Sequence, residues 1–282
     1  MGPCMKTILI TGSTNGIGLE AAVTLAREGH KVVLVGRDEA KTRRSVDEVK
    51  QRSGSVNVES LLGDFSSQAS VRALAEAYRK KYDRLDVLVN NAGTVNTERV
   101  LTKDGLENTF AVNHLGYFLL TQLLLDLVIK SAPARIVVVS SAGHYRGTMD
   151  LEDLGFEKGG YGIMAAYTRS KLANVMMTRS LAKRLDGKGV TVNALHPGGV
   201  ATGIWERAPS WTRPLIAVLK KVAFITPEEG SKTLTYLATS PEVEGKTGLY
   251  FEKNKPKECA PLAKDEVLAE KLWVKSAELV KR

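Results

Sequence analysis

The chain has 282 residues, of which 43% are hydrophobic and 25% are charged, an ordinary composition for a soluble protein. A chain of this length suits one large α/β domain, or at most two small ones, and needs no disulfide or metal to stabilise its core. Lys and Arg outnumber Asp and Glu by nine, but the excess is spread along the sequence and lacks interleaved aromatic residues. Nucleic-acid binding is therefore not expected, and the positive charge suits a small anionic ligand better.

Cysteine content and apolar stretches bear on the compartment. Cys4 and Cys259 form no framework of paired spacings, which indicates reduced thiols in a cytoplasmic protein. The apolar run at 7–10 is too short for a signal peptide or a membrane anchor. The longest apolar stretch, 118–129, is interrupted by polar residues and is expected to form a buried or interface helix.

The hydrophobic pattern predicts a repeated alternation of strands and helices. Short aliphatic and β-branched runs, typical of strands, occur at 6–11, 31–36, 56–63, 85–90, 134–140, 189–195 and 247–251. These runs are continuously apolar, as strands covered on both faces must be. The pattern therefore predicts one α/β domain over 1–282, with a doubly wound, mostly parallel, seven-stranded sheet and helices on both faces.

Three later segments interrupt or end this alternation. Residues 203–225 mix Trp, Pro and aliphatic residues with Arg and Lys, and we interpret them as a lid or pocket wall, with weak contact to a membrane surface as the alternative. Residues 250–264, rich in Lys and Pro, are expected to form a surface loop. A last helix is predicted at about 265–280.

A glycine-rich turn lies directly between the first predicted strand and the first predicted helix. Glycines at this place allow a tight turn and a close approach of the backbone to a pyrophosphate, and the helix N-terminus supplies N–H donors. The residues predicted to form this phosphate-binding turn are Gly12, Ser13, Asn15, Gly16, Ile17 and Gly18.

A second pattern places Tyr167 and Lys171 four positions apart in an apolar helical run. This spacing is one helical turn, so both side chains lie on one face. A nearby fixed cation favours the phenolate, so Lys171 is expected to lower the pKa of Tyr167. The result would be a phenol that can give or take a proton. His114, His144 and His196 have no partner at metal-ligand spacing, and no metal site is expected.

The spacing Gly-x-x-x-Gly-x-Gly, together with Tyr-x-x-x-Lys, resembles the short-chain dehydrogenase/reductase family, and the resemblance covers nearly the whole chain. It implies that Asn90, Ala92 and Gly93 support the sheet centre and border the adenosine site. It also implies that Pro197, Gly198, Val200 and Thr202 hold the nicotinamide, and that Asp64, followed by Phe65, contacts the adenine.

The same resemblance implies a catalytic set formed by Asn113, Ser141, Tyr167 and Lys171. Tyr167 would be the proton donor and Ser141 would orient the reacting oxygen. Lys171 would also bind the nicotinamide ribose, and Asn113 would anchor a water connected to this lysine. Tyr145 and Tyr161 have no lysine one turn onward, and are expected to line the substrate pocket with Trp205 and Trp211.

The end of the second predicted strand bears on the cofactor. An NAD(H) site usually offers a carboxylate here, whereas Gly36-Arg37 offers a guanidinium that suits a phosphate. We therefore expect NADP(H) rather than NAD(H), with Ser13 as a possible second phosphate contact.

The long gap between Ser141 and Tyr167 resembles the retinol dehydrogenase-like branch of the family, which implies a hydrophobic carbonyl or alcohol substrate such as a retinoid, lipid aldehyde or steroid. Two alternatives stay open: a biosynthetic tailoring ketoreductase with a narrow substrate, and a non-catalytic NADP(H)-sensing binding protein. The apolar helices expected at 116–130 and 165–185 suit either a homo-oligomer interface or the chain's own core.

Overall fold

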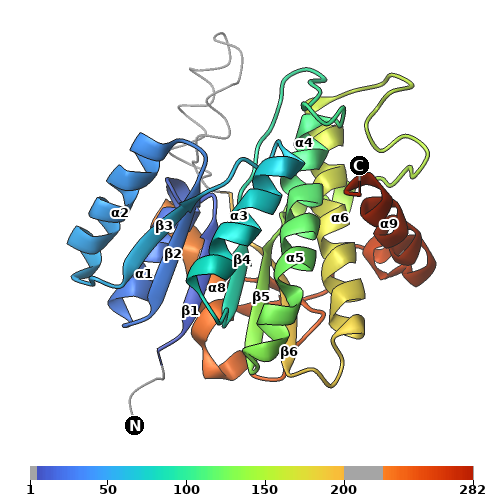
Figure 1. Cartoon of the computed structure of the whole chain (residues 1–282). Helices are drawn as coiled ribbons and strands as arrows, with labels where there is room; N and C mark the ends of the chain where they lie inside the picture. Colours follow the sequence, from blue (N-terminus) through green and yellow to red (C-terminus); the bar gives the residue numbers. More distant parts are fainter. Residues whose placement is uncertain (1–4, 200–224, 282) are drawn as a thin grey trace.

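The structure is a computed structural model that describes residues 5–199 and 225–281. Within these residues eight strands form one sheet in the order β3-β2-β1-β4-β5-β6-β7-β8, and every neighbouring pair is parallel except the antiparallel pair β7 and β8 (Figure 1). The strands are β1 Thr7–Thr11, β2 Lys31–Gly36, β3 Val58–Leu62, β4 Val87–Asn90, β5 Ala134–Val139, β6 Val190–His196, β7 Tyr250–Glu252 and β8 Lys255–Lys257.

The prediction of seven strands is wrong by one, because residues 250–264 are not only a loop. Lys253 and Asn254 have φ angles of 50° and 61°, and this two-residue turn folds β8 back onto β7. All three residues of β8 are exposed, and the strand reads Lys-Pro-Lys. An exposed edge strand carries no apolar pattern, so nothing in the sequence distinguishes it from a loop.

Helices cover both faces of the sheet, which confirms the doubly wound arrangement (Figure 1). The helices α1, α2 and α8 pack on one face, while α3, α5 and α6 pack on the other, with α9 beside α6. Their bounds are α1 Gly16–Arg27, α2 Glu39–Ser53, α3 Gln68–Lys81, α4 Asn108–Phe110, α5 Gly116–Lys130, α6 Ile163–Arg184, α8 Pro227–Thr239 and α9 Glu266–Leu279. A π-helical turn, η1 Ala111–Leu115, joins α4 to α5, and three 3₁₀ segments are η2 Ala142–Arg146, η5 Pro241–Val243 and η6 Pro261–Lys264.

The continuous apolar runs of the strands follow from this layering. In β1, Ile8 and Ile10 face the core beneath α1 and α8, while Leu9 faces the core beneath α3 and α5. Successive side chains of a strand point to opposite faces, so both sets must be apolar when both faces are covered.

The helical run Asn108–Lys130 is long and apolar enough to cross a membrane, judged by length and composition alone, and no other helix in the described residues meets that test. In this structure 67% of its most apolar window is buried inside the chain. It is packed as a core helix, as the sequence predicts for 118–129.

Candidate active site

The functional residues predicted from the sequence gather where β1, β4, β5 and β6 end. Because parallel strands present their carboxyl ends at one edge of the sheet, the turns after these strands lie together. This edge holds the glycine-rich turn, the Asn90–Gly93 segment, Ser141 and the turn that begins at Pro197.

The glycine-rich turn is shaped by close backbone contacts. Gly12 has a φ of +63°, and a Cβ there would lie 2.6 Å from the Cα of Ala92. A Cβ on Gly18 would lie 2.6 Å from the carbonyl oxygen of Gly12. The side chain of the N-cap residue Asn15 makes no capping hydrogen bond, so it does not occupy the first N–H groups of α1. The turn therefore fits the phosphates of a dinucleotide.

The end of β4 is tied to this turn by hydrogen bonds. Thr11 Oγ1 accepts bonds from the backbone N–H groups of Asn91 (2.8 Å) and Ala92 (3.0 Å). Asn91 Nδ2 donates to the carbonyls of Thr11 and Gly12 at 2.9 and 3.0 Å. Asn90 is fully buried and donates to Thr121 Oγ1 at 3.0 Å, so it supports the sheet from within. Thr11 and Asn91 belong to the two sequence motifs at this edge, but neither was among the residues predicted to bind the cofactor.

The prediction that Ser13 contacts a phosphate is contradicted by its position. The side chain is fully buried; its hydroxyl donates to the carbonyl of Ile10 at 2.9 Å and accepts from the N–H of Val35 at 3.0 Å. Both bonds fasten the turn to the sheet, so the hydroxyl points away from any ligand.

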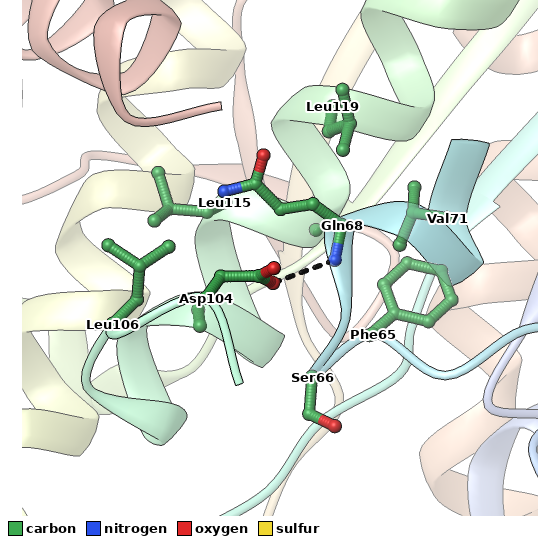
Figure 2. Close-up of a pocket in the computed structure, with 10 residues that line it drawn as sticks. Phe65, Ser66, Gln68, Val71, Asp104, Leu106, Leu115 and Leu119 are labelled. Atoms are coloured by element: carbon green, nitrogen blue, oxygen red, sulfur yellow. Dashed lines mark hydrogen bonds between the residues drawn. The ribbon is translucent and has the colours of Figure 1, made fainter. Parts of the chain in front are cut away.

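The ring of Phe65 is likewise a core group rather than a ligand contact. It lies beside a small pocket between α3 and α5, near Val71 and Leu119, as Figure 2 shows. It packs edge-on against Tyr117, with ring centroids 6.4 Å apart. Its main chain follows Asp64, whose Oδ1 accepts the N–H of Ser66 at 2.9 Å. Only the main chain of Phe65 is left to border a cofactor.

Tyr167, Ser141 and Lys171 are brought together as predicted. Tyr167 and Lys171 lie on α6, with Lys171 Nζ 5.7 Å from the centroid of the Tyr167 ring. Ser141 is the N-cap of η2; its Oγ accepts the N–H of Gly143 at 3.0 Å and is hydrogen-bonded to the Tyr167 side chain. Lys171 Nζ donates to the carbonyl of Val139 at 3.1 Å.

Burial decides the electrostatics of this pair. Burial raises the pKa of Tyr167, and the hydrogen bond from Ser141 opposes that change only in part. Burial also lowers the pKa of Lys171 to about 7. The expected lowering of the tyrosine pKa by the lysine is therefore wrong for the protein alone, because the cost of removing a phenolate from water is larger than any gain from the cation. Tyr167 is protonated at neutral pH.

Asn113 lies in the π-helical turn η1, a type of irregular turn often found at functional sites. Its side chain is occupied: Oδ1 accepts the N–H of Thr94 at 2.8 Å, and Nδ2 donates to the Thr94 carbonyl at 3.0 Å and to Ser170 Oγ at 3.1 Å. Its main-chain carbonyl accepts a bond from Asn174 Nδ2 at 2.9 Å. Any role in binding water falls to this carbonyl rather than to the side chain.

The turn after β6 is described as far as Gly199. Gly198 has a φ of +97°, and the Gly199 carbonyl accepts the N–H of Ile225 at 2.8 Å. The predicted residues Val200, Thr202, Trp205 and Trp211, and the segment 203–225 except Ile225, lie outside the described residues.

The two tyrosines expected to line the pocket are bound to other parts of the chain. Tyr145 is 41% exposed, and its hydroxyl donates to the carbonyl of Glu258. The Tyr161 hydroxyl donates to the carbonyl of Asn96 at 3.1 Å. Their contact with a substrate stays a prediction.

One residue beside the site was missed. Tyr117 is fully buried, its hydroxyl donates to the carbonyl of Ala92 at 2.6 Å, and Lys171 Nζ lies 5.9 Å from its ring centroid. In the sequence it belongs to an apolar helical stretch and looks like any other core aromatic residue. Among residues 5–199 and 225–281, no group of three His, Cys, Asp or Glu side chains could hold a metal ion.

This architecture and this set of residues are those of a short-chain dehydrogenase. The chain belongs to that family, whose model, described as short chain dehydrogenase, matches residues 6–213. It is 44% identical to retinol dehydrogenase 14 of Mus musculus over 95% of this chain and 84% of that protein.

Solved structures agree with this assignment. An uncharacterized protein from Mycobacterium paratuberculosis is 30% identical with a TM-score of 0.80, covering 98% of this chain and 93% of that one. The Pseudomonas aeruginosa RhlG/NADP active-site complex is 27% identical with a TM-score of 0.71, covering 88% and 95%. The chain is thus an oxidoreductase of the retinol dehydrogenase-like type by descent.

Proposed function

We propose that this protein transfers hydride between NADP(H) and a hydrophobic carbonyl or alcohol. The observation that carries the proposal is the meeting of Tyr167, Ser141 and Lys171 at the carboxyl edge of the sheet, beside the glycine-rich turn. A bound nicotinamide would supply the hydride, and side chains of the protein must donate or accept the proton.

The hydrogen bonds assign each side chain a task. Because Ser141 Oγ accepts the N–H of Gly143, its own proton is directed to the Tyr167 oxygen or to a substrate oxygen placed there. Negative charge develops on a carbonyl oxygen during reduction, and two hydroxyl donors stabilise it. Tyr167, protonated at neutral pH, then gives up its proton, and the Lys171 ammonium stabilises the phenolate left behind.

The chain also offers the parts that a dinucleotide phosphate needs. Arg37 follows β2 and is exposed, without a hydrogen-bond or ion-pair partner recorded in the described residues. The neighbouring carboxylate of Asp38 is committed to capping α2, where it accepts the N–H of Lys41 at 2.7 Å. A cation is thus available to a 2′-phosphate, while the carboxylate next to it in the chain is engaged in the helix cap. The NADP complex of RhlG, a relative by structure, supports this preference.

The substrate class rests on the relatives. The similarity to a retinol dehydrogenase supports a hydrophobic carbonyl or alcohol, and we propose residues 203–225 as the apolar lid, with contact to a membrane surface as the alternative. We propose the cytoplasm as its location. NADP(H) as cofactor favours the direction of reduction.

The first test is NADPH oxidation, followed at 340 nm, against a panel of hydrophobic aldehydes and ketones. Replacing Tyr167 by Phe removes the proton donor, and we expect kcat to fall by about 10³-fold while the Kd for NADPH stays the same. Turnover of one narrow substrate would favour a tailoring ketoreductase. Tight NADPH binding without any turnover would sink the catalytic proposal and favour a cofactor-sensing protein.

Cofactor preference is tested by Arg37→Ser. Loss of the guanidinium should weaken NADPH binding by about 10- to 100-fold and leave NADH binding unchanged, because only NADPH carries the 2′-phosphate. Arg43→Ser is the matched control, since Arg43 is also exposed near the start of α2 but pairs with Glu39. Equal loss for both cofactors would contradict the assignment of Arg37.

A further inference from the structure

The C-terminal segment, defined here as residues 259–279, contacts the active site through two buried histidines. We infer that His144 and His114 are positioning residues, which hold the main chain of Ser141 directly and that of Asn113 through Asn174, and that the C-terminal segment supplies the hydrogen-bond donor that each histidine needs at Nε2. The inference rests on the proposed catalytic roles of Ser141 and Asn113.

His144 has two main-chain partners, which together determine its protonation. The N–H of Ala260 points at Nε2 at 3.1 Å, so Nε2 must be the bare, accepting nitrogen. The proton therefore sits on Nδ1, which donates to the carbonyl of Ser141 at 2.7 Å. His144 is fully buried, and burial lowers its pKa, which keeps the ring neutral.

His114 repeats this arrangement with side-chain partners. Asn174 Nδ2 faces the carbonyls of Asn113 (2.9 Å) and Val139 (3.5 Å), so the amide cannot be reversed and Oδ1 faces His114. His114 Nδ1, at 3.3 Å from that oxygen, must then be the donor. Nε2 is left to accept the hydroxyl proton of Ser276, 3.0 Å away on α9.

The hydrogen bonds of His114 therefore form a chain in which every donor points the same way, from the Ser276 hydroxyl through His114 and Asn174 to the carbonyl of Asn113. It also reaches the lysine, because the Val139 carbonyl near Asn174 accepts the bond from Lys171 Nζ. Asn174 and Ser276 are fully buried, and burial lowers the pKa of His114 to about 4.

A neutral imidazole has two tautomers, and only the Nδ1–H form can make these bonds. At His144 the Ala260 N–H, which can only donate, requires this form. At His114 the Asn174 oxygen requires it, and the Ser276 hydroxyl supplies the matching donor to Nε2. Loss of either donor would leave Nε2 without its partner and weaken the hold of the ring on Ser141 or Asn174. The C-terminal segment therefore supports the catalytic main chain at a distance, through these two donors.

Nitrogen NMR on histidine-labelled protein tests this directly, because the chain has only four histidines. We expect His114 and His144 both to be neutral with the proton on Nδ1. Ser276→Ala should leave the proton of His114 on Nδ1, because the Asn174 oxygen still requires it, but should shift the Nε2 resonance to that of an acceptor without a hydrogen bond. Ser276→Thr, which keeps the hydroxyl, should leave the wild-type Nε2 resonance. An Nε2–H form at either histidine in the wild-type protein would overturn the inference, whether or not the protein turns over a substrate.

Matched substitutions of His144 test the effect on catalysis. Both His144→Asn and His144→Gln remove the imidazole ring. The amide of Asn lies where Nδ1 lies and can still donate to the carbonyl of Ser141, whereas the amide of Gln lies where Nε2 lies and can contact only Ala260. We expect kcat to fall less than about 3-fold for Asn and at least about 10-fold for Gln, with the KM for NADPH unchanged, because a small misplacement of catalytic groups has costs of this size.

The control for general damage is His30→Gln. His30 is also buried, but it lies far from the site between α1 and β2, where it accepts the N–H of Lys6 at 3.3 Å. This variant should lose stability without loss of kcat. Equal kcat for His144→Asn and His144→Gln would show that the ring merely fills space, and would overturn the positioning role. Absence of turnover by the wild-type protein would instead count against the proposed function. The NMR result would then decide alone whether the two histidines carry their protons on Nδ1.

Discussion

At the scale of the single residue, the buried ammonium of Lys171 lowers the stability of the fold, and its place in the active site explains why it is kept. Its side chain is 4% exposed, and Nζ has a single recorded hydrogen-bond partner in the described residues, the carbonyl of Val139. Burial without a carboxylate lowers its pKa from 10.5 to about 7. Functional sites commonly keep such groups at the expense of stability.

The pH dependence of this cost follows from linkage. Below about pH 7 the lysine is protonated in both states, so the folded protein bears the whole cost of burying the ammonium. Between about pH 7 and pH 10.5 the unfolded chain still binds the proton that folded Lys171 has released, so this part of the stability rises with pH.

We therefore expect Lys171→Met to raise the free energy of unfolding by about a few kcal/mol at pH 6, which is the size that the pKa shift of Lys171 implies. At pH 9 the same substitution should raise it by clearly less. Urea denaturation of the cofactor-free protein at both pH values measures the difference. Lys50→Met, on the exposed surface of α2, should show no such pH dependence. A stabilisation independent of pH would mean that improved packing, and not the charge, is responsible.

At the scale of the element, the glycine-rich turn is set by the approach of β4 to β1. Gly12→Ala places a Cβ 2.6 Å from the Cα of Ala92 in a residue with φ +63°, whereas Gly54→Ala, at the C-terminus of α2 with φ +73°, meets nothing within 4 Å. Both changes share the left-handed strain of roughly 1–2 kcal/mol. Only the first adds a main-chain collision, which costs roughly 1–3 kcal/mol more.

Gly12→Ala should therefore lose more unfolding free energy than Gly54→Ala and should also bind NADPH at least about 10-fold more weakly, since the turn is displaced. Chemical denaturation and a fluorescence titration with NADPH measure the two effects. If both variants kept wild-type NADPH affinity, the turn would not be the phosphate site.

The elements that could be predicted from the sequence are those with a repeating physical pattern. The central strands were predicted correctly because both of their faces are buried, while β3, a partly exposed edge strand, kept enough aliphatic residues to be recognised. The turn at Gly12 and the Tyr167–Lys171 pair have spacings that follow from turn and helix geometry. Strand β8 could not be found, because exposed Lys and Pro residues carry no such pattern. The prediction for Ser13 is wrong for another reason: its neighbours in sequence indicate a ligand loop, while tertiary contacts turn its hydroxyl inward.

The histidines show the limit of reading local spacing. Local spacing addresses His114 and His144 only as possible metal ligands, because their partners in the fold, Ser276 and Ala260, lie 162 and 116 residues further along the chain. No local pattern predicts a hydrogen bond over such a separation. The direction of the Tyr167 pKa shift was missed for the same reason, since burial is a property of the folded chain.

At the scale of the whole molecule, helix α9 joins parts of the chain that are distant in sequence. Trp273 packs edge-on against Phe118 of α5, with ring centroids 4.8 Å apart, and the Arg184 guanidinium of α6 lies 4.1 Å from its ring centroid. The carbonyl of Leu279 accepts a bond from Gln68 Nε2 of α3 at 2.9 Å. One terminal helix thus contacts α3, α5 and α6, the three helices of one face.

Because α9 bridges these helices, its loss should weaken the fold as a unit. Trp273→Ala removes an aromatic contact and a cation–π contact, and we expect it to lower the free energy of unfolding by about 2 kcal/mol. Val274→Ala is the matched control: this neighbour is 49% exposed, and its change should stay within about 0.5 kcal/mol. Urea unfolding followed by circular dichroism should remain one transition for both variants. A separate early transition in Trp273→Ala would show that α9 detaches on its own, and then the C-terminal segment could not hold its contacts with His114 and His144 as a rigid part of the domain.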